Sequence, residues 1–269
     1  MKRLSKDELQ AIVGRMPTTR HEDWKYTDLA RARDISSRWL DTDEGAPATA
    51  LAEQIKQITT SIDASWLVIA NGEIRDLASV SGATVEKLSK APDGHHALAE
   101  LNAALLKEGL RIVVDGTPDK PIGVLVIDGT EDTSMSQAYV EIAFEQNSVG
   151  SVIEYHASLG DADQYANTVV SLRVGDGASA SHVRIQGRAR NHVQTGRTDV
   201  TVGKDARFSS AGFDLGGGLI RNDIVIDIAN PGAEVSFDGL YLAGEGQHID
   251  NHTRVDHRVG PAISKQEYR

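Results

Sequence analysis

The densest group of side chains able to do chemistry lies near the end of the chain, between His248 and His257. Successive side chains of an extended strand alternate between two faces, so His248, Asp250 and His252 would project from the same face. Imidazole and carboxylate groups at this spacing can hold a divalent metal ion. The competing interpretation is an outward strand face whose histidines bond to a neighbouring strand, and we favour it because the motif is short.

Two other features resemble binding sites less closely. The segment 214–219 contains three consecutive glycines, as phosphate-binding loops do, but no Lys-Ser or Lys-Thr pair follows it. We predict a tight corner between strands there. His156 and His182 fall near inward positions of β-rich segments and are predicted to be hydrogen-bonded core histidines. We therefore assign no catalytic residue.

Composition excludes several classes of protein. The chain has no cysteine, so it provides no thiol nucleophile and no thiolate ligand for zinc or an iron–sulfur cluster. Its 39 acidic and 28 basic residues give a net charge of −11, which opposes binding to nucleic acid or to an anionic bilayer. We find no signal peptide and no apolar run of about 20 residues, and we predict a cytoplasmic location.

The first part of the chain, 1–109, is predicted to be a helical and mixed region. Ser5 and Glu8 fit a capping box that opens a short amphipathic helix ending at Pro17. A second helix is predicted over about 48–58 and a short strand pair over 67–77. A third helix carries Leu98, Leu101 and Leu105 on one face, and Gly109 is predicted to be its C-terminal cap.

From residue 110 onward the pattern changes to short β-rich runs, and the decisive feature is an internal repeat. A small residue after a turn recurs at Ser151, Ala178, Ala206, Ala233 and Ala262, at spacings of 27, 28, 27 and 29 residues. Each repeat also contains a second strand with strict alternation of apolar and polar residues.

Two strands in about 28 residues fit neither helical repeats nor propeller blades, and they indicate a β-helix. We therefore predict a mainly β protein, with a parallel β-helix of two strands per coil and about five coils over 110–269. The helical region is expected to cap one end of this solenoid.

The other end of the solenoid is expected to be open, because the chain stops within a coil and therefore looks truncated. An unpaired strand edge invites association, including formation of a homodimer. The predicted contact residues for a partner or a second copy lie near this end: His248, Asp250, His252, Asp256 and His257.

One alternative is a β-helix that binds or cleaves polysaccharides. Such enzymes place paired carboxylates on neighbouring strands, and Asp199, Asp223 and Asp227 are the candidates here. Carboxylates along a strand more often form its solvated face. A purely structural solenoid is the third interpretation.

Three segments together resemble the SufB/SufD family of the SUF iron–sulfur cluster assembly system, and the Trp-Lys-Tyr segment favours the SufD branch. The resemblance covers most of the chain in the same order. It is carried by the following residues: 20–29; 101–104 with Glu108, Gly109, Pro121 and Ile122; and 239–242, 247–253, His257 and 264–269.

The resemblance implies a right-handed parallel β-helix that acts as a non-catalytic scaffold subunit. It implies pairing with a SufB-like subunit and a SufC-like ATPase, with a cluster present only transiently in the complex and no tightly bound cofactor. Family members also carry a later Asp-Val-Lys-Cys-Ser-His-Gly-type segment with a candidate cluster-site histidine. This sequence has no matching segment, so that role is not transferred to any residue here.

Overall fold

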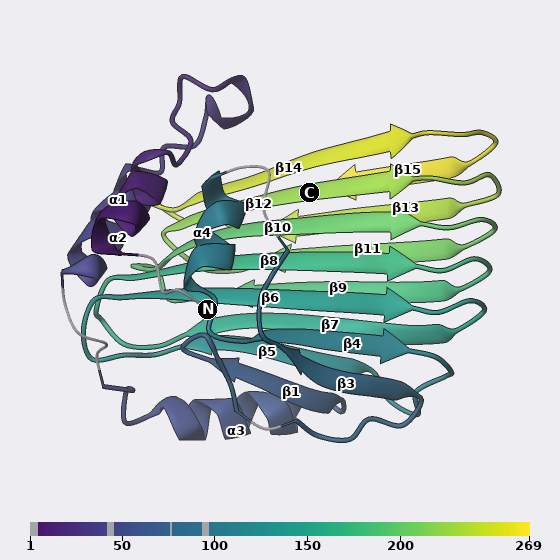
Figure 1. Ribbon diagram of the computed structural model, residues 1–269, viewed down its shortest axis with the longest axis horizontal. Coiled ribbons are helices and arrows are strands. Elements are labelled where there is room, and N and C mark those ends of the chain that lie inside the picture. Colours follow the sequence, from purple (N-terminus) through teal and green to yellow (C-terminus); the bar gives the residue numbers. More distant parts are fainter. Residues whose placement is uncertain (1–4, 42–45, 76, 93–96) are drawn as a thin grey trace.

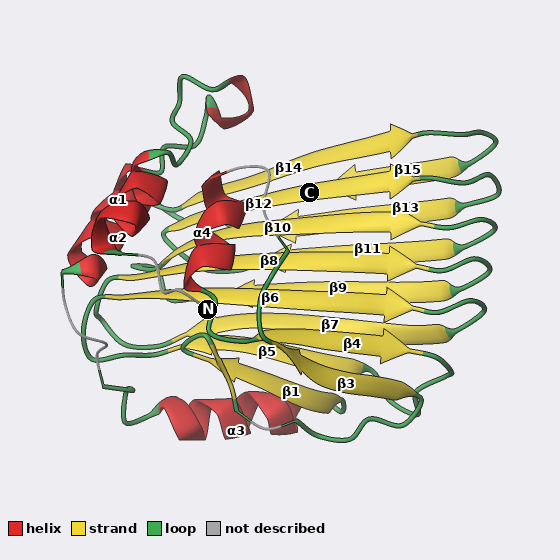
Figure 2. Ribbon diagram, in the orientation of Figure 1, coloured by secondary structure: helices red, strands yellow, loops and turns green. Residues whose placement is uncertain are grey.

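The computed structural model describes residues 5–41, 46–75, 77–92 and 97–269 (Figures 1 and 2). Within these residues the helices are α1 (Lys6–Gly14), η1 (Glu22–Trp24), α2 (Ala30–Leu40), α3 (Leu51–Ser61) and α4 (Ala97–Leu105). The strands are β1 (Ser65–Ala70), β2 (Glu73–Ile74), β3 (Ala83–Leu88), β4 (Gly109–Val114), β5 (Ile122–Asp128), β6 (Ser134–Phe144), β7 (Val149–Ser158), β8 (Gln164–Val174), β9 (Ser179–Gly187), β10 (Val193–Val202), β11 (Arg207–Asp214), β12 (Leu219–Ile228), β13 (Glu234–Tyr241), β14 (His248–His257) and β15 (Ile263–Tyr268).

The strands form two sheets that face each other across one core (Figure 2). Sheet I has the order β15-β13-β11-β9-β7-β5-β1-β2, and sheet II has the order β14-β12-β10-β8-β6-β4-β3. From β4 onward the chain alternates between the sheets, and from β6 onward each strand pairs in parallel with the strand two places earlier. This is the predicted parallel β-solenoid, with about five turns and two strands per turn.

The repeat spacing follows from strand pairing. In sheet II, Val140 lies opposite Val170, which lies opposite Thr198, so successive coils differ by 30 and then 28 residues. In sheet I, Ala178, Ala206 and Ala233 occupy equivalent positions, as predicted.

The predicted register was wrong for the first member of the repeat. Val149 pairs with Ser179, so Ser148 and not Ser151 is equivalent to Ala178. Strands β7 and β8, of 10 and 11 residues, are each one residue longer than β9 and β10 of the next coil, so the spacing from Ser148 to Ala178 is 30 residues. An assumed constant period placed the alignment three residues too late.

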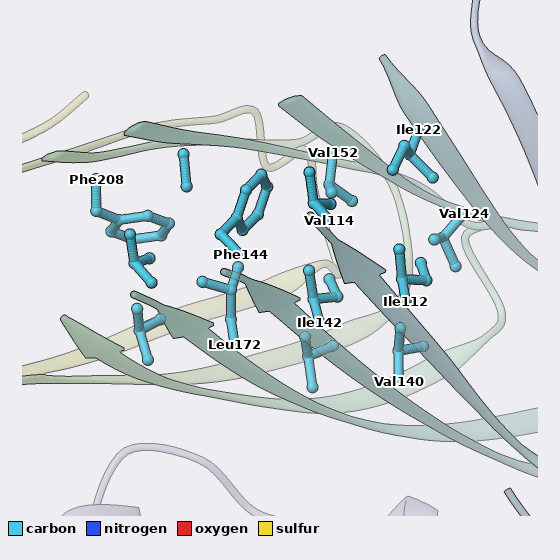
Figure 3. Close-up of a cluster of buried hydrophobic side chains, with 14 of the residues drawn as sticks. Ile112, Val114, Ile122, Val124, Val140, Ile142, Phe144, Val152, Leu172 and Phe208 are labelled. Atoms are coloured by element: carbon cyan, nitrogen blue, oxygen red, sulfur yellow. The ribbon is translucent and has the colours of Figure 1, made fainter. Parts of the chain in front are cut away.

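The interior of the solenoid has an apolar half and a polar half. The apolar half follows the corners that lead from sheet II to sheet I. There, Ile142, Phe144 and Leu172 pack against Val152 and Phe208 from the opposite sheet (Figure 3). The polar half follows the opposite corners and contains buried charged side chains.

The helical region does not cap an end of the solenoid as predicted. Helices α1, α2 and α4 form a layer over the outer face of sheet II, joined to it by buried Leu98, Leu101, Tyr165 and Val193 (Figure 1). Helix α3 packs through Ile58 on the outer side of β1, β5 and β7. The first coil is instead covered by β2, which pairs with β1, and by β3, which pairs with β4.

Local predictions in this region are mostly confirmed. The Ser5–Glu8 capping box opens α1, and α3 and the β1–β2 pair lie near their predicted positions. Helix α2 and strand β3 were not predicted. Gly109 is the first residue of β4 and not a helix cap. The small, acidic and proline residues of 41–49 predict a tether, and residues 42–45 of this loop lie outside the described residues.

Replacing Leu172 by alanine should lower the free energy of unfolding by about 2–5 kcal/mol, because Leu172 is buried among apolar side chains from both sheets. Urea unfolding followed by circular dichroism measures this change. The matched control is Arg173→Ala on the same strand, which removes an exposed ion pair with Glu145 and should cost no more than about 1 kcal/mol. Equal losses for both variants would contradict the assigned interior.

Candidate functional site

The predicted residues His248, Asp250 and His252 all lie on β14 and share its outer face, as the alternation predicted. Strand β14 pairs in parallel with β12, which places Asp250 beside Arg221 and His252 beside Asp223. The structure therefore brings the three candidates to one surface, under the N-terminal segment.

Arg221 is the centre of this surface, and we call its set of contacts the Arg221 clamp. Its side chain is 3% exposed, and its guanidinium lies 4.4 Å from the ring centroid of Trp24. It donates to the Asp23 carbonyl oxygen at 2.8 Å, to Asp223 Oδ1 at 2.9 Å and to Asp250. A buried guanidinium is tolerated here because carboxylates and a ring face surround it.

Thr27 extends the clamp along β14. Its hydroxyl donates to Asp250 and lies 3.1 Å from His248 Nε2. The Trp-Lys-Tyr segment belongs to the region that we predict to cap one end of the solenoid, but it lies on the outer face of sheet II. Trp24 is buried in this contact, whereas Tyr26 is 78% exposed.

A cleft of about 510 Å³ adjoins the clamp between the N-terminal segment and strands β10, β12 and β14. Three arginines line it, and each already has an acidic partner: Arg15 with Glu100, Arg197 with Asp199, and Arg254 with Asp256. The lining residues are Arg15, Pro17, His21, Glu22, Asp23, Trp24, Ala97, Arg197, Asp223, Val225, His252 and Arg254.

The metal hypothesis for β14 finds no geometric support. Asp250 is engaged by Arg221 and Thr27, and His252 Nδ1 lies 3.5 Å from Asp223. Across the described parts of the chain, no group of three or more histidine, cysteine, aspartate or glutamate side chains is arranged to hold a metal ion.

The two remaining interface candidates lie at the far end of β14. Asp256 contacts Arg254 and Arg258, whereas His257 is exposed and its Nε2 lies 2.9 Å from the Ser264 hydroxyl. They are therefore separated from His248 and Asp250 by the length of the strand, and the five candidates do not form one compact patch.

The carboxylates of the polysaccharide hypothesis are each paired with arginine. Asp199 contacts Arg197, Asp223 belongs to the Arg221 clamp, and Asp227 contacts Arg258. Acid and base catalysis at a glycosidic bond needs carboxyl groups in distinct protonation states around a sugar site. These positions serve as ion pairs on the outer face of sheet II.

The glycine-rich segment is a solenoid corner, as predicted. It joins β11 to β12 around Gly217, whose φ of 83° lies in the left-handed region. A Cβ on Gly216 would lie 2.3 Å from the Arg188 carbonyl oxygen, so the preceding coil passes too close for any larger residue.

Sequence reasoning missed most of the polar half of the interior. His156 and His182 are buried histidines, as predicted, but their shared partner Glu154 was not identified. Glu154 Oε1 lies 2.5 Å from His156 Nε2, and Glu154 Oε2 lies 2.9 Å from His182 Nε2. Burial disfavours the ionised form of Glu154 and would raise its pKa. The hydrogen bonds and charge interactions with His156 and His182 have the larger effect and hold the pKa of Glu154 well below its usual range.

Two buried ion pairs complete this interior network. Arg184 binds both oxygens of Asp214, at 2.7 and 3.0 Å, and Arg188 Nη1 lies 2.6 Å from Asp128 Oδ2. Burial opposes ionisation of Asp214, but Arg184 and hydrogen bonds from two asparagines lower its pKa. Aligning the coils correctly would have identified these residues from the sequence. Every second side chain of a strand points inward, and each of these residues falls at such a position.

Strands β14 and β15 lie at one end of the two sheets. Within the described residues, β14 pairs with β12 alone and β15 with β13 alone. Large apolar side chains near this edge are exposed, including Leu242 at 61% and Ile263 at 57%. An edge of this kind is a template for pairing with another chain.

The solenoid corresponds to a known family. The family described as SUF system FeS cluster assembly, SufBD core domain, matches residues 125–269, which cover β6–β15 and most of β5. This chain belongs to the SufB/SufD family. The matched part contains the interior network, β14 and the free edge, so the predicted family is confirmed.

Curated relatives agree with this assignment. The iron–sulfur cluster assembly protein SufD of Escherichia coli is 22% identical over 269 residues, covering 94% of this chain and 62% of that protein. A SufBD family iron–sulfur cluster assembly protein of Mycobacterium tuberculosis is 25% identical over 244 residues, covering 90% and 55%. This chain therefore spans little more than half of the length of these relatives. Among its described helices, none is long and apolar enough to cross a membrane.

Arg221→Met should lower the free energy of unfolding by about 3 kcal/mol, because it leaves Asp223 and Asp250 without their cation and removes the contact with Trp24. Urea unfolding and a change in tryptophan emission would report it. Arg258→Met, which removes exposed ion pairs with Asp227 and Asp256, serves as the control and should change stability by less than about 1 kcal/mol. Unchanged emission in Arg221→Met would show that Trp24 does not depend on the clamp.

Stability should also fall in mild acid because of His192, which is buried between the Ser158 hydroxyl and the Ala162 carbonyl oxygen. Burial, with a contribution from Arg188, lowers the pKa of His192 to about 4. The unfolded chain takes up this proton near pH 6.5, so the folded state loses roughly 3 kcal/mol as the pH falls from about 6.5 to about 4.

His192→Gln should remove this part of the pH dependence, measured as the difference from wild type in unfolding free energy at each pH. Exposed His21→Gln is the control and should follow the wild-type curve. An unchanged acid slope in His192→Gln would show that the buried imidazole does not cause the loss.

Proposed function

We propose that this chain is a non-catalytic, SufD-like scaffold subunit of the SUF iron–sulfur cluster assembly machinery and acts in the cytoplasm. The observation that carries the proposal is the family match over residues 125–269, which include β6–β15. Ion pairing of Asp199, Asp223 and Asp227 also favours a scaffold over a polysaccharide enzyme.

The proposed primary partner is a SufB-like subunit that pairs with the edges of β14 and β15. Main-chain groups on such an edge provide affinity, and neighbouring side chains provide selectivity. Asp256 and His257 lie on this strand edge and are suited to direct contact. His248, Asp250 and His252 would act indirectly, by holding the N-terminal segment against β12 and β14.

A SufC-like ATPase is the second proposed partner, and a cluster would be present only transiently. The chain has no cysteine, so thiolate ligands for a cluster must come from a partner subunit. We accordingly propose that this chain binds no cofactor tightly. A homodimer through the same free edge is the alternative assembly.

The test is co-expression of the chain with SufB-like and SufC-like proteins, followed by affinity purification of the complex. Wild type should retain both, and Ile263→Lys should weaken capture of the SufB-like subunit about tenfold or more, because lysine on an edge strand opposes pairing. Val149→Lys is the matched control, since Val149 is 47% exposed but begins a strand inside sheet I.

Equal capture by Ile263→Lys and wild type would contradict pairing at this edge. Loss of both partners from wild type would contradict the scaffold assignment. Analytical ultracentrifugation of the chain alone distinguishes the homodimer, because a monomer at high concentration would exclude it.

A further inference from the structure

The interior of the solenoid contains a buried group of three titratable side chains outside the proposed contact edge. Glu154 and His156 come from β7 and His182 comes from the next strand of sheet I, β9. All three are at most 3% exposed. Each histidine bonds through Nε2 to a different oxygen of the same carboxylate. We call these residues the Glu154 triad.

The charges around the triad do not cancel. Asp128, Glu154 and Asp214 contribute three negative charges, and Arg184 and Arg188 contribute two positive ones. His192 adds none near neutral pH, because burial keeps it unprotonated. Sheet II faces this region with uncharged groups, including Thr198 and Asn222. Burying one unmatched negative charge is costly, and one bound proton would balance it.

The two histidines differ in their capacity to take this proton. His182 Nδ1 lies 3.3 Å from the Ser210 hydroxyl, so both ring nitrogens of His182 face groups that can accept a hydrogen bond. His156 Nδ1 is buried and has no hydrogen-bond partner among the described residues. A hydrogen on this nitrogen would therefore be a buried donor without an acceptor, which costs free energy. Burial and the two nearby arginines also disfavour a second proton on His156, lowering its pKa.

We propose that the Glu154 triad is a buried proton-binding site, with an imidazolium at His182 and a neutral, Nε2-protonated imidazole at His156. A cavity of about 10 Å³, roughly enough for one water, is lined by His182, Ser210 and Tyr268. His182, Ser210 and Tyr268 belong to β9, β11 and β15, so the cavity lies among side chains of three strands of sheet I. The Glu154 triad would thus hold one positive charge, carried by His182 and not by His156.

The test is nitrogen-15 NMR of the imidazole rings in the labelled full chain at neutral pH. His156→Gln and His182→Gln assign the two signals by their loss. We expect a hydrogen on both ring nitrogens of His182 and on Nε2 alone of His156. A bare nitrogen on His182, or a doubly protonated His156, would overturn the assignment.

Two further variants separate proton binding from packing. Glu154→Gln removes the negative charge, and His182 should then be neutral at the pH where it is charged in wild type. If that variant does not fold, Ser210→Ala still tests the site, because Nδ1 loses its acceptor and His182 should release its proton at a lower pH. Ser209→Ala, at an exposed position of the same strand, is the control. Identical titration of all variants would refute the proposed site.

Discussion

Every coil of this protein depends on its neighbour for backbone hydrogen bonds. A parallel strand satisfies its N–H and C=O groups only when another strand lies on each side, and here these strands come from coils about 28 residues away in sequence. No coil can therefore be stable alone, and the end coils need either a cover or a partner. At the first coil β2 and β3 provide the cover, whereas among the strands that the structure describes β14 pairs with β12 alone and β15 with β13 alone.

Stacking also explains how the interior tolerates charge. Equivalent positions in successive coils lie directly opposite each other, so one inward column can carry Glu154, Arg184 and Gly212 in turn. The glycine leaves room for the Arg184 guanidinium, because a Cβ there would lie 3.1 Å from its Nη2 atom. Asp214 then supplies a bidentate partner one coil further on. In this column Glu154 and Arg184 are thus each bonded to a side chain of the next coil, His182 and Asp214.

The outer face of sheet II joins the helical region to the solenoid. Arg221 stabilises this contact because its guanidinium fills the space between Trp24, Asp223 and Asp250. Residues near the start and near the end of the sequence therefore depend on the same ion cluster. This arrangement accounts for the histidine-rich strand without a metal ion, and it links the N-terminal segment to the strands that border the free edge.

The sequence by itself determined the parallel β-solenoid, its two strands per coil, the capping box at Ser5 and the alternation that places His248, Asp250 and His252 on one face. These features depend on period and on near neighbours, which a sequence displays directly. Only the tertiary structure decided the partners: Arg221 for Asp250, Glu154 for the two histidines, and sheet II as the surface under the helices. Such contacts join residues tens to hundreds of positions apart, and an error of three residues in the predicted register at Ser151 was enough to conceal the interior columns. Register is decided by hydrogen bonding between whole strands and by the length of each strand, and neither can be read from one repeat alone.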